Sequence, residues 1–109
     1  MVIPQAASHA VFRAEKMGKA DLVSADSLFA GLNCFEPGQE HSLHTHAGQD
    51  KLYYILEGEG DVTVGGETTR VQPGDLILAK AEEPHAMANP GPGRLVVMVV
   101  MAPPPAAKK

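Results

Sequence analysis

Three of the five histidines in this 109-residue chain lie close together, at His41, His44 and His46. His44 and His46 are separated by one residue, so on a β-strand their side chains point to the same face. Two imidazoles on one face can converge on a single ion, and imidazole is a ligand for zinc, copper, iron and nickel. Taken alone, a His-x-His pair fits two solvated histidines at the edge of a strand equally well.

A third candidate ligand, His85, lies much further along the chain. It follows Pro84 at the end of DLILAKAEEPH, just after an apolar stretch that predicts a strand. If a barrel brings that strand beside the first, the three histidines make a site with open positions for water, substrate or dioxygen. Considered alone, His85 is better explained as a turn histidine bonded to nearby backbone. His41 is three residues before His44, so on a regular strand it is expected on the other face, at the surface or rim. A position behind the ligands is the less favoured alternative, because the chain right after Pro37-Gly38 need not form a regular strand.

Short apolar segments separated by glycine and proline must position these residues. The segments are LFAGLNCFE, KLYYILE, DVTV, TTRVQ, DLILA and RLVVMVVM, with turn signals such as Gly65-Gly66 and Pro73-Gly74 between them. Several short strands at this spacing predict an antiparallel all-β sandwich or barrel. Residues 19–30 fit either a helical turn or a first strand, and no good helix is expected after residue 31.

The composition fits one globular domain, with 44% hydrophobic and 20% charged residues. A net charge of −4 without a basic patch argues against nucleic acid as a partner. The longest apolar stretch, residues 95–102, is too short to cross a bilayer, and the N-terminus lacks the pattern of a signal peptide. Cys34 is the only cysteine, so no disulfide can form within the chain. We therefore expect a cytoplasmic protein with no membrane partner.

The spacing of these residues resembles the two motifs of the cupins, a family of small β-barrel proteins. The first motif, G-x5-H-x-H-x3,4-E-x6-G, is matched by Gly38, His44, His46 and Gly58. The second motif, G-x5-P-x-G-x2-H-x3-N, is matched by Gly74, His85 and Asn89. The resemblance implies a mostly antiparallel double-stranded β-helix, or jelly-roll barrel, whose histidines hold a divalent metal. Residues 1–102 then form a single barrel domain, with motifs at about 38–58 and 74–89, and residues 103–109 form a proline-rich tail.

The sequence departs from the first motif at the glutamate, which is a further metal ligand in metal-binding cupins. Counting back from Gly58 places Lys51 at this position, whereas counting forward from His46 with the shorter spacing places Asp50 there. A protonated lysine in contact with a divalent ion is repelled by several kcal/mol, even at an effective dielectric constant of ~20.

Three arrangements remain open. Lys51 points away from a three-histidine site, or Asp50 serves as a fourth ligand, or the site holds no metal and Lys51 binds an anion. The run LYYIL is apolar on both strand faces, so it does not decide between them. We favour a metal on His44, His46 and His85, with Asp50 as an optional fourth ligand.

Two functions from different classes follow from the resemblance. The first is a metal-dependent enzyme, holding Fe, Mn, Zn, Ni or Cu, with dioxygenase-like or isomerase-like chemistry on a small organic molecule. The second is a non-catalytic module that binds a small ligand or anion. A homodimer is also expected, because a short barrel has sheet edges to protect and the run LVVMVVM can pack against a second copy. The substrate is not indicated, since one barrel hosts many chemistries.

Overall fold

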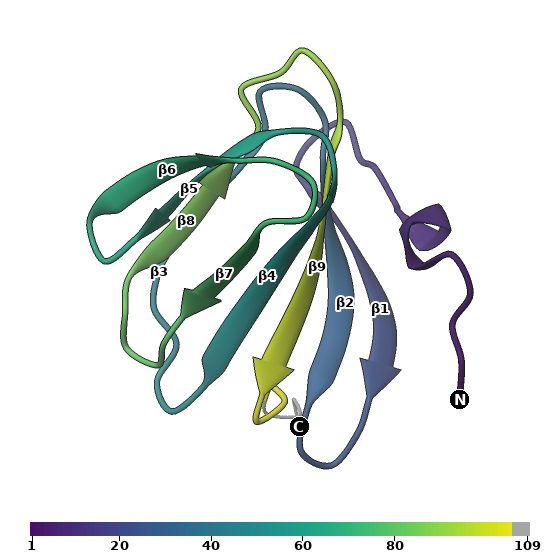
Figure 1. The fold of residues 1–109 in the computed structure, drawn as a ribbon, viewed down its shortest axis with the longest axis vertical. Coiled ribbons are helices and arrows are strands. Elements are labelled where there is room, and N and C mark those ends of the chain that lie inside the picture. The colour runs from purple at the N-terminus through teal and green to yellow at the C-terminus, as the bar shows by residue number, and fades with distance from the viewer. Residues whose placement is uncertain (106–109) are drawn as a thin grey trace.

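The computed structural model describes residues 1–105, which form two facing antiparallel β-sheets (Figure 1). A single-turn 3-10 helix, η1 (Ala6–His9), lies in the N-terminal segment. The strands that follow are β1 (Gly18–Ser24), β2 (Phe29–Phe35), β3 (Glu40–His44), β4 (Asp50–Glu57), β5 (Gly60–Val64), β6 (Glu67–Val71), β7 (Leu76–Ala79), β8 (His85–Ala88) and β9 (Leu95–Ala102). Within these residues no helix is long and apolar enough to cross a membrane.

The larger sheet has the strand order β1-β2-β9-β4-β7, and the smaller sheet has the order β3-β8-β5-β6. Every neighbouring pair is antiparallel. The antiparallel all-β barrel predicted from the sequence is confirmed. The undecided segment 19–30 contains most of β1, a turn and the first residues of β2. The predicted tail is described only as far as Pro105, and its two lysines lie outside the described residues.

The main core lies between the two sheets and follows the alternation of strand side chains. β9 contributes Leu95, Val97 and Val99, and β4 contributes Tyr53 and Ile55, all of which are almost fully buried. These two strands are neighbours in the larger sheet. The centre of that sheet is therefore fixed against the smaller sheet by apolar packing.

A second apolar cluster lies on the outer face of the larger sheet. Leu32, Cys34 and Val96 are buried there, and Ala10 and Phe12 of the N-terminal segment pack against the cluster. Strand β9 is thus apolar on both faces partly because the chain covers its own outer surface. That cover accounts for part of the apolar run that suggested packing against a second copy.

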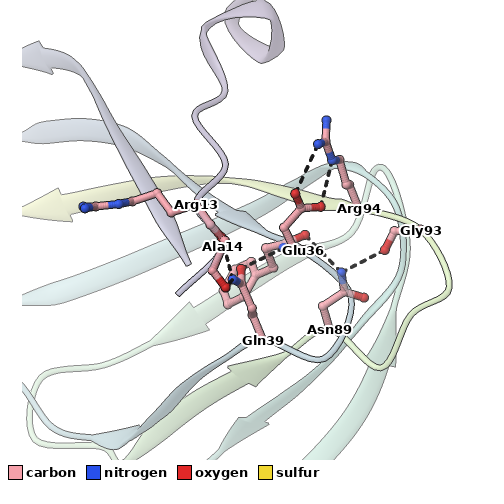
Figure 2. A network of polar contacts seen from close by, with 8 residues as sticks. Arg13, Ala14, Glu36, Gln39, Asn89, Gly93 and Arg94 are labelled. Carbon is pink, nitrogen blue, oxygen red and sulfur yellow. Dashed lines mark hydrogen bonds and ion pairs between the residues drawn. The ribbon is translucent and has the colours of Figure 1, made fainter. Parts of the chain in front are cut away.

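One end of the barrel, drawn at the top of Figure 1, is tied together by polar contacts between the β2–β3 and β8–β9 connections (Figure 2). The side-chain amide of Asn89 donates to the carbonyls of Phe35, at 3.1 Å, and Gly93, at 2.8 Å. Its Oδ1 accepts from the backbone N–H of Gly91 at 2.9 Å. The N–H of Gly38 donates to the Asn89 carbonyl at 2.8 Å. The first glycine of one motif and the last asparagine of the other therefore meet here.

Gly58, the last glycine of the first motif, belongs to the same end of the barrel. Its φ is +80°, in the left-handed region that favours glycine. A Cβ at this position would lie 2.0 Å from the carbonyl oxygen of Arg94. The motif requires glycine here because the turn after β4 lies directly against the β8–β9 connection.

Candidate metal centre

At the opposite end of the barrel, two strands and a loop bring three histidines together. His44 is the last residue of β3, His85 is the first residue of β8, and the two are paired across the strands. His46 lies just beyond β3, in the loop to β4, and not on the same strand as the sequence suggested. One ring nitrogen from each of the three lies within 4.8 Å of the others. The ring centroids of His44 and His85 are 4.2 Å apart, and those of His44 and His46 are 4.9 Å apart.

The ring nitrogens of this cluster are arranged as metal ligands. Nδ1 of His44 donates to the Ser42 carbonyl at 2.7 Å, and Nδ1 of His85 donates to the Glu83 carbonyl at 3.0 Å. Because a carbonyl can only accept, the proton sits on Nδ1 and the lone pair on Nε2. Nε2 of His44, His46 and His85 is buried without a hydrogen-bond partner among the described residues. A divalent transition metal fits this set of imidazole nitrogen donors.

The protonation state of the cluster suits the same role. Burial lowers the pKa of both His46 and His85, and the positive charge of Lys51 lowers them further. Both rings are therefore neutral near pH 7, which is the form that binds a metal.

His41 is placed differently from the sequence-based expectation of a surface or rim residue on the other face. Its ring packs on His44, with centroids 4.1 Å apart, and its Nδ1 is buried without a partner among the described residues. Burial, followed by the charges of His44 and Lys51, lowers its pKa to about 3. The cause is an irregularity in the β3–β8 pairing between His41 and His44, which turns His41 to the inner side. Its nitrogens are not among the three that converge.

Lys51, and not Asp50, faces the interior of the barrel. Lys51 is 4% exposed and shares the inner face of β4 with Tyr53 and Ile55. Asp50 is exposed, and its Oδ1 accepts a hydrogen bond from the Ala81 N–H at 2.9 Å. The structure brings His44, His46 and His85 together but does not bring Asp50 to them.

The Lys51 ammonium lies in an unusual environment for a lysine. Its Nζ is 5.2 Å from the ring centroid of Tyr53, a cation–π distance. Among residues 1–105 no carboxylate forms an ion pair with it. Burial, with the charge of Lys19, lowers its pKa to about 8, so it is mostly protonated at pH 7.

Two adjoining cavities open beside these residues. An inner cavity of about 350 Å³ is lined by Lys19, Asn33, His41, Lys51 and the apolar residues of β2 and β9. An outer cavity of about 570 Å³ shares Lys19, His41 and Lys51 and adds His46. Both cavities are bordered by Pro104 and Pro105, which follow β9. Of the three clustered histidines, His46 borders the outer cavity, beside Lys19 and Lys51.

The fold and the motifs define the family. The family model described as Cupin domain matches residues 31–101, and the chain belongs to the cupin family. Its two sheets form the double-stranded β-helix expected from the resemblance. The crystal structure of TT1209 from Thermus thermophilus superposes with a TM-score of 0.91 at 36% identity, covering 96% of this chain and all of the other.

Two relatives are named for what they bind or catalyse. An oxalate-binding protein from Thermotoga maritima is 31% identical over 88 residues, which is 81% of this chain and 72% of the relative. A 5-nitrosalicylic acid 1,2-dioxygenase from Bradyrhizobium is 33% identical over 73 residues. That match covers 67% of this chain but only 35% of the dioxygenase. The chain therefore spans about a third of the second protein.

Proposed function

We propose that this protein is a small metal-dependent cupin with dioxygenase-like or isomerase-like activity on a small organic molecule, and that His44, His46 and His85 hold the metal. The observation that carries the proposal is the set of three buried Nε2 atoms that have no hydrogen-bond partner within residues 1–105, two of them on rings tethered through Nδ1. Leaving such groups unpaired in a protein interior is unfavourable, so their convergence favours a bound ion.

The chain's own residues have distinct parts in this proposal. The Ser42 and Glu83 carbonyls orient the rings of His44 and His85 by accepting from Nδ1. The apolar core beneath the cluster keeps bulk water away from it. A metal bound there would supply Lewis acidity or, for iron, dioxygen chemistry at its open positions. The described function of the dioxygenase relative supports an oxidative reaction, while that of the oxalate-binding relative supports a small acid as ligand.

A non-catalytic binding module is the second candidate, and one observation favours it. Lys51 stands at the position of the motif glutamate and points inward. This substitution removes a metal ligand and adds a positive charge, which favours ligand binding over turnover. Oxygen uptake by the iron-loaded protein, measured across small carbonyl, phenolic and thiol compounds, separates the two. Thermal stabilisation by a compound that is not consumed supports the binding module.

We also propose that the protein forms a homodimer through the outer face of β4 and β7. Leu52 lies opposite Leu78, and Tyr54 lies opposite Leu76, in the register of these strands. All four side chains are exposed, from 37% for Leu52 to 64% for Leu76, and the N-terminal segment does not cover them. Solution scattering at micromolar concentration should give twice the monomer mass. A monomeric mass contradicts this part of the proposal.

Elemental analysis tests the metal site directly. The wild-type protein is incubated with zinc, manganese or iron, desalted and assayed for bound metal. The His44→Ala/His46→Ala variant should retain almost none. His9→Ala is the matched control, because His9 is exposed in η1 and far from the cluster in the sequence, and it should bind as the wild type does. Equal and negligible metal in all three proteins would refute the proposed site.

A further inference from the structure

The interior of the barrel mouth carries the positive charge of Lys51, whereas Asp21, a carboxylate that lines the inner cavity, is exposed at its rim. Lys51 is 4% exposed, and within residues 1–105 it forms no ion pair with a carboxylate. The histidines beside it do not offset this charge, because an imidazole side chain carries no negative charge. A buried cation is costly unless it is paired, and the ring of Tyr53 is its partner in place of a carboxylate among the described residues.

We propose that the cavity beside the histidine cluster binds a small organic acid, with Lys51 as the buried counter-ion for its carboxylate and Lys19 as a second cation at the rim. The inference rests on the proposed function for the location of the site and deepens it by naming the class of ligand. It does not need a bound metal, because the two lysines are part of the protein in either state.

The lining of the inner cavity matches a small acid with an apolar body. Lys19 and Lys51 both line it, while Phe29, Val99 and Met101 provide apolar surface and Asn33 provides an amide. A volume of about 350 Å³ is at the lower end for ligand pockets, which suits a molecule the size of a single ring or a short diacid.

The charge around the cavity also selects for an acid over a neutral molecule. Asp21 lines the cavity too, but it is exposed at the rim and is not ion-paired with either lysine. The outer cavity continues the same charge pattern, with Lys19 and Lys51 beside His46. An entering carboxylate therefore meets Lys19 first and Lys51 at depth, and a metal on the three histidines would add further positive charge.

Calorimetric titration of metal-free protein tests this assignment. The probes are benzoate and succinate, with benzamide and succinamide as neutral molecules of nearly the same shape. Wild-type protein should bind at least one acid, and its amide at least tenfold more weakly. Lys51→Met keeps most of the length of the side chain and removes its charge, and it should weaken acid binding at least tenfold. Lys19→Met should weaken it less, and Lys51→Arg should restore part of the affinity.

Lys80→Met is the matched control, because Lys80 is exposed on the β7–β8 connection and lines neither cavity. It should bind the acids as the wild type does. Circular dichroism checks each fold, and Lys51→Gln replaces Lys51→Met if that variant fails to fold. The proposal is overturned if the amides bind as tightly as the acids, if neither acid binds, or if loss of the Lys51 charge changes affinity less than twofold. Zinc retention by the same wild-type sample reports on the metal site separately.

Discussion

Buried polar groups have hydrogen-bond partners at one end of the barrel and lack them at the other end, within the described residues. At the end shown in Figure 2, Asn89 is 2% exposed, and both its amide nitrogen and its carbonyl oxygen are hydrogen-bonded. At the other end, His85 is 1% exposed and its Nε2 has no hydrogen-bond partner among the described residues. Lys51 is 4% exposed there and forms no ion pair with a described carboxylate. Both ends are built from the same two sequence motifs.

The difference separates stabilising residues from functional ones. A buried polar group that is fully hydrogen-bonded is compatible with a stable fold, whereas one left unpaired destabilises the protein. The Asn89 end therefore holds the barrel closed, and the histidine end keeps groups whose partners must come from outside the chain. Mutations at the Asn89 end should therefore lower the stability of the fold, whereas mutations at the histidine end should change ligand binding.

The largest change in ligand affinity is expected at the histidine end when zinc is added. Zinc at ~100 times its dissociation constant should stabilise the wild-type protein by about 2.7 kcal/mol. His44→Ala should lose that stabilisation, with metal affinity lowered by roughly 100-fold or more, since even outer partners of a ligand contribute 10–100-fold. Urea unfolding with and without zinc measures both quantities. A zinc effect that survives in His44→Ala, while His9→Ala behaves as wild type, would contradict the ligand assignment.

The Asn89 end should show the reverse behaviour. Asn89→Ala leaves the carbonyls of Phe35 and Gly93 and the N–H of Gly91 without their side-chain partner. We expect a loss of about 2–4 kcal/mol in the free energy of unfolding, because buried groups lose their hydrogen bonds. The folded fraction should still retain zinc.

Gln72→Ala, at an exposed position near the same end, is the control for this experiment and should change stability by less than about 0.5 kcal/mol. If Asn89→Ala unfolds no more easily than Gln72→Ala, the hydrogen bonds of Asn89 do not stabilise the barrel.

A third prediction concerns the unpaired charge of Lys51 in the metal-free protein. Its pKa is lowered to about 8 in the folded state, below the 10.5 of a free lysine. Between these values the unfolded chain binds more protons, so wild-type stability should rise with pH across this window. Lys51→Met should therefore be more stable than the wild type by about 1–3 kcal/mol at pH 7, and this advantage should fade as the pH approaches 10.5.

Urea unfolding at pH 7 and pH 10.5, in buffers without carboxylates, measures the effect, and Lys80→Met serves as the control. A Lys51→Met variant that is less stable than wild type at pH 7 would show that the ammonium is satisfied within the protein.

The spacing of the motif residues along the sequence was enough to predict two features of this structure. The barrel and the convergence of His44, His46 and His85 followed from the motifs. The inward direction of Lys51 did not, because the outer face of β4 carries Leu52 and Tyr54, which are as apolar as the residues on its inner face. Alternation gives two faces, but only the packing of the sheets decides which one is inside.

The favoured expectation for His41, a surface or rim position, was wrong for a different reason. Regular alternation puts it opposite His44, but the pairing of β3 with β8 is irregular between these two residues. Such a bulge depends on the partner strand, and the four-residue segment HAMA that forms β8 carried little strand signal of its own. Such an error does not change the predicted fold, but it does change which side chains are predicted to line the site.

The smallest effect is expected from the exposed ion pair at the Asn89 end. Arg94 donates to Glu36 at 2.9 Å, and its guanidinium also lies 4.2 Å over the ring of Phe12, which covers the outer face of the larger sheet. Exposed ion pairs contribute little, so Glu36→Gln should change the urea midpoint least of all these variants, and salt should erase the change. Arg94→Gln should cost more than Glu36→Gln, because it also removes the contact with Phe12. If the two variants were equal, the stability of this end would come from Asn89 and the core, and the N-terminal segment would be held by its apolar contacts alone.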